Sequence, residues 1–180
     1  MNRRHALLLL TGTALSACTT PAPPTIGPDG QLLPQAYRIT GAVAREIPGN
    51  ALQAVNALRA GAGAPPVRLD DALTRAARVH SRDMSLQNRP WHFGSDGTNP
   101  IDRARRAGYG GRLLGEAVAE TFETETQTIA AWAQERGTRR VLVDRTATDM
   151  GFSWFQEPGG KIWWTLNMGA GAGGVAVAAL

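Results

Sequence analysis

The stretch that decides the fold runs Leu69-Asp70-Asp71-Ala72-Leu73-Thr74-Arg75-Ala76-Ala77-Arg78-Val79-His80-Ser81-Arg82-Asp83-Met84. Its apolar residues recur at spacings of three and four, which predicts an amphipathic helix that ends near Asn88. The aspartates at its start suit a helix N-terminus, where unpaired amide groups carry partial positive charge. His80 falls on the apolar face, and there we favour a hydrogen-bonded core residue over a metal ligand.

Other helices are predicted on both sides of this stretch. Upstream, Asn50 is a candidate N-cap for a helix that stops at Gly61-Ala62-Gly63. Downstream, Asn99-Pro100 opens a short helix, because proline is favoured at the first helical position. A further helix is expected from Thr124 to Gly137.

The remaining segments predict β-structure. Residues 113–121 look extended, and an alternating pattern on either side of Glu157-Pro158-Gly159-Gly160 predicts a β-hairpin. Helices and antiparallel strands occupy mostly separate stretches, so the fold class is α+β, with a domain over residues 46–168. We interpret the tryptophans of the hairpin as core residues, with an exposed aromatic surface as the alternative: Trp154, Trp163 and Trp164.

The amino terminus predicts export. Arg3 and Arg4 precede a short apolar run, which is too short to span a membrane and is typical of a signal peptide over residues 1–17. The sequence Leu15-Ser16-Ala17-Cys18 resembles the bacterial lipobox, so we expect Cys18 to be lipidated and to anchor the chain to the membrane. An ordinary secretory signal with a chance cysteine is the alternative. Cys18 is the chain's one cysteine, so a disulfide within the mature chain is not expected.

Two segments flank the predicted domain. Residues 18–45 are rich in proline and glycine, which predicts an extended, semi-rigid tether between the lipid and the domain. Residues 169–180 form a tail of glycine, alanine and a few aliphatic residues. Because Thr19 is not the acidic residue that retains some lipoproteins at an inner membrane, we favour an outer membrane where the cell has one.

The charge balance argues against nucleic-acid binding. The 180 residues hold 19 Lys plus Arg against 15 Asp plus Glu, a net charge of +4. All the basic residues except Lys161 are arginines, which accounts for the calculated isoelectric point of 10.2. No basic cluster or nucleic-acid-binding motif is present, so we expect no nucleic-acid partner. Separately, we expect the chain to be a monomer.

Few residue types are available for catalysis. The sequence contains no GxSxG elbow and no HExxH motif, and Cys18 is assigned to lipidation, so any catalysis must use histidine and carboxylates. His92 lies in a polar, glycine-rich loop, where side chains often line clefts, although a plain loop histidine is equally compatible with the pattern. Glu116 interrupts an apolar strand, and a solvated outer face is an alternative explanation for it.

Several motifs occur in a fixed order across residues 50–168, and each is weak alone. They are Ala77-x-x-His80-Ser81-x-Asp83-Met84, His92-x-Gly94-Ser95-Asp96-Gly97, Gly115-Glu116-x-Val118-Ala119, Trp132-x-x-Glu135, Gly137-x-Arg139, Met150-Gly151-Phe152 and Trp163-Trp164-Thr165. Together they resemble the bacterial branch of the CAP superfamily, the SCP-like relatives of cysteine-rich secretory proteins, venom antigens and plant pathogenesis-related proteins. The resemblance implies an α-β-α sandwich, with a central antiparallel sheet between helical layers and a cleft on one side.

The family's cleft is lined by two histidines and two glutamates. By motif, His92, Glu116 and Glu135 match three of them, and Thr138 stands where bacterial relatives have the second histidine. Ser95 and Asp96 are expected to line the same cleft. His92, Glu116 and Glu135 still offer a possible divalent metal site, but we expect weak zinc binding because a hydroxyl is a poor replacement for an imidazole.

Three functions follow from these observations. We favour a non-catalytic binding module, anchored in the cell envelope, whose cleft holds a lipid, a peptide or a cell-wall fragment. A hydrolase that activates water through His92, Glu116 and Glu135 is the first alternative. An envelope scaffold protein is the second alternative.

Overall fold

The computed structural model describes residues 37–171. The signal peptide, Cys18, most of the predicted tether and the end of the tail lie outside the described residues. Five helices and four strands make up the described part, in the order α1 (Gly41–Gly61), β1 (Arg68–Leu69), α2 (Asp71–Gln87), α3 (Pro100–Arg106), β2 (Arg112–Thr121), α4 (Glu125–Gln134), α5 (Arg136–Leu142), β3 (Asp149–Gln156) and β4 (Ile162–Ala170). None of the helices in this range combines the length and apolar character that a membrane crossing requires.

The sheet has the strand order β1-β3-β4-β2. β3 and β4 form the predicted hairpin, and β2 pairs antiparallel with β4 from Arg112↔Ala170 to Thr121↔Ile162. The predicted α+β class is confirmed, but the sheet is mixed rather than wholly antiparallel, because β1 pairs parallel with β3 at Arg68↔Asp149 and Leu69↔Met150. A strand of two residues is too short to show an alternating pattern, so the sequence did not reveal it.

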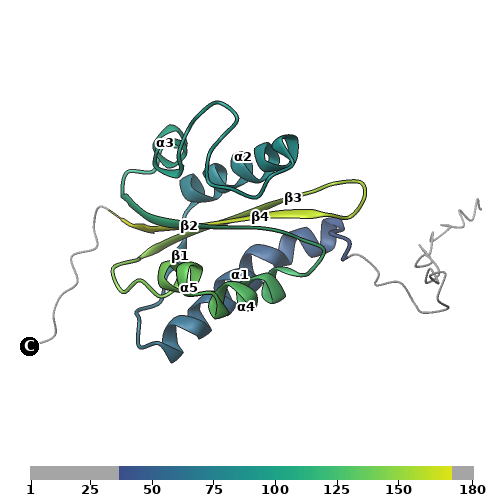
Figure 1. The fold of residues 1–180 in the computed structure, drawn as a ribbon. Helices are drawn as coiled ribbons and strands as arrows, with labels where there is room; N and C mark the ends of the chain where they lie inside the picture. The colour runs from purple at the N-terminus through teal and green to yellow at the C-terminus, as the bar shows by residue number, and fades with distance from the viewer. Residues whose placement is uncertain (1–36, 172–180) are drawn as a thin grey trace, which may run out of the picture. The chain divides into compact units, whose positions relative to one another are not determined.

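Helices cover both faces of this sheet. α2 and α3 lie on one face, and α1, α4 and α5 lie on the other, as Figure 1 shows. The implied three-layer sandwich is therefore present. Because both faces are covered, successive residues of β4 are buried on opposite sides: Trp163 and Trp164 are each fully buried. Trp154 is half-buried and packs against Trp164, with ring centroids 6.1 Å apart.

The helix before the first loop starts earlier than predicted. α1 begins at Gly41 with Thr40 as N-cap, whose hydroxyl accepts a hydrogen bond from the Val43 amide. Asn50 is therefore not an N-cap; it lies inside α1 and its amide donates to Glu125 Oε1 at 2.9 Å. Residues 41–45, assigned above to the tether, belong to this helix. Burial of one face of α1, at Ile47, Ala51 and Val55, stabilises it despite Pro48.

The predicted helix from Thr124 to Gly137 is two helices. Thr124 is the N-cap, as expected, with a capping box to Gln127. The helix is interrupted at Glu135, whose backbone is extended (φ −85°, ψ 126°), and α5 follows. The domain also continues beyond residue 168, because β4 runs to Ala170.

α2 matches its prediction and sits very close to the sheet. Asp70 caps its start, accepting from the Leu73 amide at 2.8 Å, and Asn88 ends it in the left-handed conformation (φ 49°). Gly151 in β3 permits the close approach, since a Cβ there would overlap the carbonyl carbon of Leu73. This contact holds α2, and with it His80, against the sheet.

Candidate functional site

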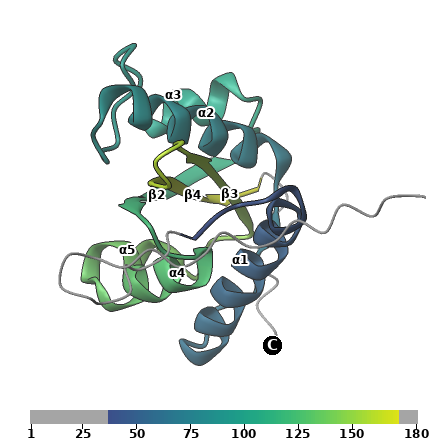
Figure 2. The ribbon, with the colours of Figure 1, turned by 90° about the vertical axis from the view of Figure 1, so that its right-hand side faces the viewer.

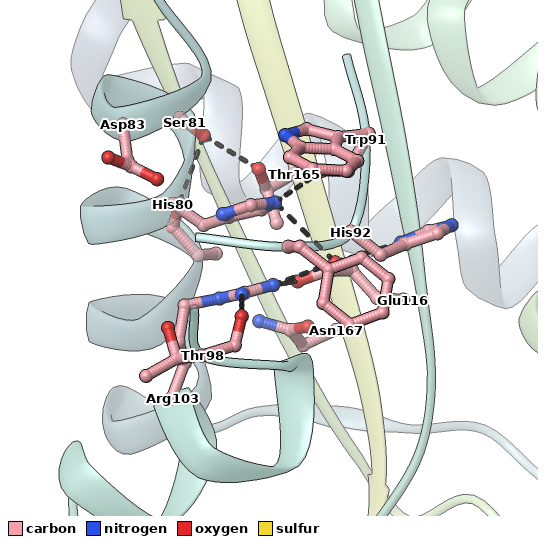
Figure 3. Close-up of polar contacts among 12 residues, drawn as sticks. His80, Ser81, Asp83, Trp91, His92, Thr98, Arg103, Glu116, Thr165 and Asn167 are labelled. Atoms are coloured by element: carbon pink, nitrogen blue, oxygen red, sulfur yellow. Dashed lines mark hydrogen bonds and ion pairs between the residues drawn. The ribbon is translucent and has the colours of Figure 1, made fainter. Parts of the chain in front are cut away.

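The Glu116 carboxylate is the centre of a buried polar cluster (Figure 3). Glu116 is 7% exposed, and Arg103 Nη2 donates to its Oε1 at 3.0 Å and its Oε2 at 2.9 Å. His92 Nδ1 lies 3.0 Å from Oε1. Gly115 faces α5, where a Cβ would meet Val141, so alternation turns Glu116 toward the opposite layer of α2 and α3. A solvated outer face therefore does not explain this glutamate.

Arg103 holds this carboxylate from the short helix α3. The guanidinium is 7% exposed, and its Nη1 donates to the Thr98 carbonyl at 3.1 Å. Pro100 and a capping box between Asn99 and Asp102 fix the start of α3, which sets the direction of Arg103. The sequence did not reveal Arg103, because three arginines lie close together in α3. Arg103 differs from Arg105 and Arg106 only in that it is buried, as is its neighbour Ala104, and burial is not visible in the sequence.

His80 lies on the other side of the carboxylate. It is fully buried, and its Nε2 is 2.7 Å from the Trp91 carbonyl oxygen and 3.7 Å from Glu116 Oε1. Because a carbonyl only accepts, Nε2 carries the proton and donates it. Burial lowers the pKa of His80, and the nearby Glu116 charge opposes that shift. The prediction of a hydrogen-bonded core histidine is confirmed, although this one also faces the cluster.

His92 is the solvent-facing member of the cluster. Its side chain is 52% exposed, whereas that of Glu116 is 1% exposed. Asp83 on α2 holds the loop, accepting from the Ser95 amide at 2.8 Å and from the Ser95 hydroxyl at 2.5 Å. Oε1 of Glu116 also accepts from Arg103, so in this contact the carboxylate accepts and His92 Nδ1 donates. The result is an imidazole oriented by a buried carboxylate.

Glu135 and Thr138 do not join this cluster. Glu135 is exposed and makes no ion pair with any described residue. Thr138 donates its hydroxyl to the Trp132 carbonyl at 2.6 Å, which links α4 to α5. Within residues 37–171, no three His, Cys, Asp or Glu side chains lie close enough to hold a metal ion. His92, Glu116 and Glu135 therefore do not form such a group among the described residues, and no ion pair joins Glu135 to His92.

The residues around His92 also fit a transition metal poorly. Arg103 brings a permanent positive charge to both oxygens of Glu116, and this charge opposes a second cation. His80 donates its Nε2 proton to a backbone carbonyl. His92 is therefore left as one exposed imidazole rather than one of a pair.

A cavity of about 480 Å³ lies beside the cluster, between α2, α3 and the loop before α3. Ser95 and Asp96 line it, whereas His92 and Glu116 do not. The Thr98 hydroxyl and amide, together with Arg106, lower the pKa of Asp96 to about 2. The full lining comprises Arg75, Ala76, Val79, Asp83, Gly94, Ser95, Asp96, Thr98, Arg103, Arg106 and Ala107. Arg103 therefore connects the cavity to the buried carboxylate.

The three-layer fold with a histidine and a glutamate at one side of the sheet defines an SCP-like domain. The profile of the cysteine-rich secretory protein family, CAP, matches residues 52–168. This chain belongs to the CAP family.

Individual proteins and solved structures are also similar to this chain. The curated protein YkwD of Bacillus subtilis, which is described as uncharacterized, is 27% identical over 112 residues, covering 62% of this chain and 43% of that protein. The chain thus spans less than half of that relative. An outer surface protein from Borrelia burgdorferi has a similar structure, with a TM-score of 0.64, 17% identity and coverage of 70% of this chain and 93% of that chain. The structure of an extracellular protein from Bacillus anthracis that contains an SCP domain has a TM-score of 0.62 and 24% identity, and the match covers 73% of this chain and 44% of that chain.

Proposed function

We propose that this chain is a non-catalytic binding module of the cell envelope, whose cavity beside α3 holds a small lipid, a peptide or a cell-wall fragment. The observation that carries the proposal is the state of the Glu116 carboxylate. Two hydrogen bonds from Arg103 and one from His92 occupy it, so it is a poor base for activating water. Its work is to hold α3 and the loop around the cavity.

The cavity suits a ligand with an apolar body and a polar end. Its volume of about 480 Å³ lies within the usual range of roughly 300–1,000 Å³ for small-molecule sites. Ala76, Val79 and Ala107 supply apolar surface. Arg103 supplies a donor, because its buried Nε has no hydrogen-bond partner among the described residues. A ligand oxygen bonded to this Nε would satisfy a group that is costly to leave unpaired.

Retention and turnover can be separated in one experiment. The purified protein is incubated with peptidoglycan, lipid extracts and a peptide library, and both retained ligands and cleaved products are identified. The binding module is supported if a ligand is retained without cleaved products and if this retention is lost in Ala76→Trp, whose side chain fills the cavity. Ala57→Trp, at an exposed position on α1, is the matched control. Retention that Ala76→Trp leaves intact contradicts the proposed cavity.

A hydrolase is the second candidate, and one contact favours it. His92 is exposed and its Nδ1 faces a buried carboxylate at 3.0 Å, which is how general-base histidines are oriented. Turnover that disappears in His92→Ala, with stability unchanged, supports this candidate. His92→Ala is a better test than Glu116→Gln, because His92 is exposed and its loss leaves the Arg103 pair intact.

We further propose export and a lipid anchor at Cys18, with an outer membrane favoured. The lipobox-like sequence supports the anchor, and the descriptions of two relatives as outer surface and extracellular proteins support the export. Mass spectrometry of the protein from its native membrane tests this proposal. An unmodified Cys18 contradicts the anchor.

A further inference from the structure

Beyond its first two residues, the outer edge of β3 has no backbone partner among the described residues, although Phe152 is 1% exposed and Trp154 is half-buried. β1 pairs with β3 only at Asp149 and Met150, and the Asp70 amide donates to the Met150 carbonyl at 2.8 Å. Backbone groups of a strand alternate in direction, so those of Phe152 and Trp154 face the same side as those of Met150. Among the described residues, no backbone group beyond the sheet itself pairs with them.

This edge lies at the bottom of a groove between two helices. The groove has a volume of about 650 Å³ and is lined by Ala44 and Pro48 from α1, by Thr74, Arg78, Val79 and Arg82 from α2, and by residues 152–155 of β3. Figure 2 shows β3 beside β4, with α2 on one side of the sheet and α1 on the other. Natural edge strands are protected by lysine, proline, a bulge, or a helix or loop that covers them. Residues 152–155 are Phe-Ser-Trp-Phe and carry no lysine, proline or bulge. The segment before α1 covers only the end of β3, where the side chain of Gln156 bonds the Tyr37 carbonyl and the Ile39 amide.

The two walls of the groove differ in chemistry. The α2 wall carries Arg78 and Arg82, which are exposed and make no ion pair with any described residue. The α1 wall presents Ala44 and Pro48. No acidic residue of the described chain lines the groove. A strand lying here would therefore meet positive charge on one face and apolar surface on the other.

The spacing of the arginines matches that of alternate residues in a strand. Four residues along a helix rise about 6 Å. Two residues along a strand rise about 6.6 Å. Side chains at alternate strand positions, all pointing to the same face, can thus meet Arg78 and Arg82 in turn.

We propose that this groove binds an extended acidic peptide, which adds to β3 as a further strand where β1 ends. The peptide backbone pairs with Trp154 and, once the side chains that line the groove move aside, with the buried Phe152, which is strand addition at a sheet edge. Acidic side chains at alternate positions pair with Arg78 and Arg82, and the apolar side chains between them pack on Ala44 and Pro48. The partner is therefore a segment of another protein that alternates acidic and apolar residues. This inference is independent of the cavity beside α3.

The test uses the full-length protein and a fluorescent octapeptide that alternates glutamate and valine. We expect saturable binding by fluorescence anisotropy. The variant Arg78→Glu/Arg82→Glu should bind this peptide at least tenfold more weakly, and it should bind the corresponding peptide that has lysine in place of glutamate. Arg136→Glu/Arg140→Glu is the matched control, because these arginines are also exposed and four residues apart on a helix, and it leaves binding unchanged. Methylating alternate peptide nitrogens, which removes the donors that face β3, abolishes binding.

Several results overturn the proposal. It is wrong if the glutamate and valine peptide does not bind. It is also wrong if Arg78→Glu/Arg82→Glu binds this peptide as tightly as the unmodified protein does, or if the methylated peptide binds as tightly as the unmethylated one. Hydrogen exchange in the full-length protein that shows the Trp154 amide already protected, which means that another segment occupies the edge, also overturns it. So does a dimer in sedimentation that is lost in Arg78→Glu/Arg82→Glu.

Discussion

Replacing Glu116 by glutamine tests whether this carboxylate is a structural anchor. The substitution keeps the shape but removes the charge that pairs with buried Arg103. Breaking a buried ion pair by removing one partner costs about 3–5 kcal/mol, because the other charge stays buried and uncompensated. The glutamine oxygen can still accept one bond from Nη2, so we expect the low end, about 3 kcal/mol of unfolding free energy.

The loss converts to a measurable shift in Tm. The described domain has about 135 residues, and an unfolding entropy of roughly 2.1 cal/mol/K per residue then gives about 280 cal/mol/K. A loss of about 3 kcal/mol therefore lowers Tm by about 10 °C. Thermal unfolding followed by circular dichroism, with urea titration alongside, measures it. The matched control is Glu120→Gln on the same strand, a partly exposed partner of Lys161, which changes stability by less than about 1 kcal/mol.

A double-mutant cycle shows whether the loss belongs to the pair. Glu116→Leu and Arg103→Met should each destabilise strongly, whereas the double variant should be clearly more stable than the sum of the two losses predicts. Purely additive losses would refute a direct pair. A Glu116→Gln protein as stable as the wild type, or more stable, would refute the structural role and favour a carboxylate kept for chemistry.

Individual contacts lead to four further predictions. Gly151→Ala should destabilise the fold by about 3 kcal/mol or more in urea titration, because its Cβ would overlap the backbone of α2 at Leu73, whereas Gly49→Ala, with open space around it, should be neutral or stabilising. Arg59→Met should lower the free energy of unfolding by at least about 2 kcal/mol, because four backbone carbonyls lose their donor. The fully buried Arg59 guanidinium donates to the carbonyls of Pro65, Leu142, Asp144 and Ala147. An unchanged Tm would contradict this role. Burial and Glu125 raise the pKa of Tyr37 from 10.0 to about 12, and burial and Asp149 raise the pKa of Tyr109. The two protonated tyrosines therefore stabilise the fold below pH 10, and this contribution is lost as the pH rises toward 12. Tyrosinate absorbance that appears at pH 10 in the folded protein would be inconsistent with this prediction. Zinc should bind weakly by calorimetry, and Thr138→His should not tighten it, because the Thr138 hydroxyl bonds the Trp132 carbonyl and Thr138 does not join the His92 cluster. Tight binding through His92 in the unmodified protein would show that the metal-poor interpretation is wrong.

The sequence predicted the elements with strong local signals. α2 was predicted because its apolar period is long and its capping residues, Asp70 and Asn88, lie at the expected ends. The hairpin was predicted because its alternation and turn residues agree. The start of α1 was mispredicted because the capping signal at Asn50 was outweighed by burial of the α1 face at Ile47, Ala51 and Val55. The break at Glu135 was missed because nothing in the local pattern marked it.

The candidate site was predicted only in part for the same reason. Motif order indicated both His92 and Glu116, and the structure brings them into contact. Arg103 gave no signal, because its role depends on the packing of α3 against the face of β2 that carries Glu116. Glu135 matched a motif, but its side chain faces solvent.

By itself the sequence determined the α+β class, the family resemblance and the residue types available for chemistry, because these depend on period, composition and local order. Only the tertiary structure decided what those residues do to one another. Whether Glu116 is a free base or one half of an ion pair depends on Arg103, which reaches it from a separate helix. Whether the edge of β3 has a backbone partner depends on how soon β1 turns away from it. Both are distances between segments that are remote in the chain, and a local pattern does not encode them.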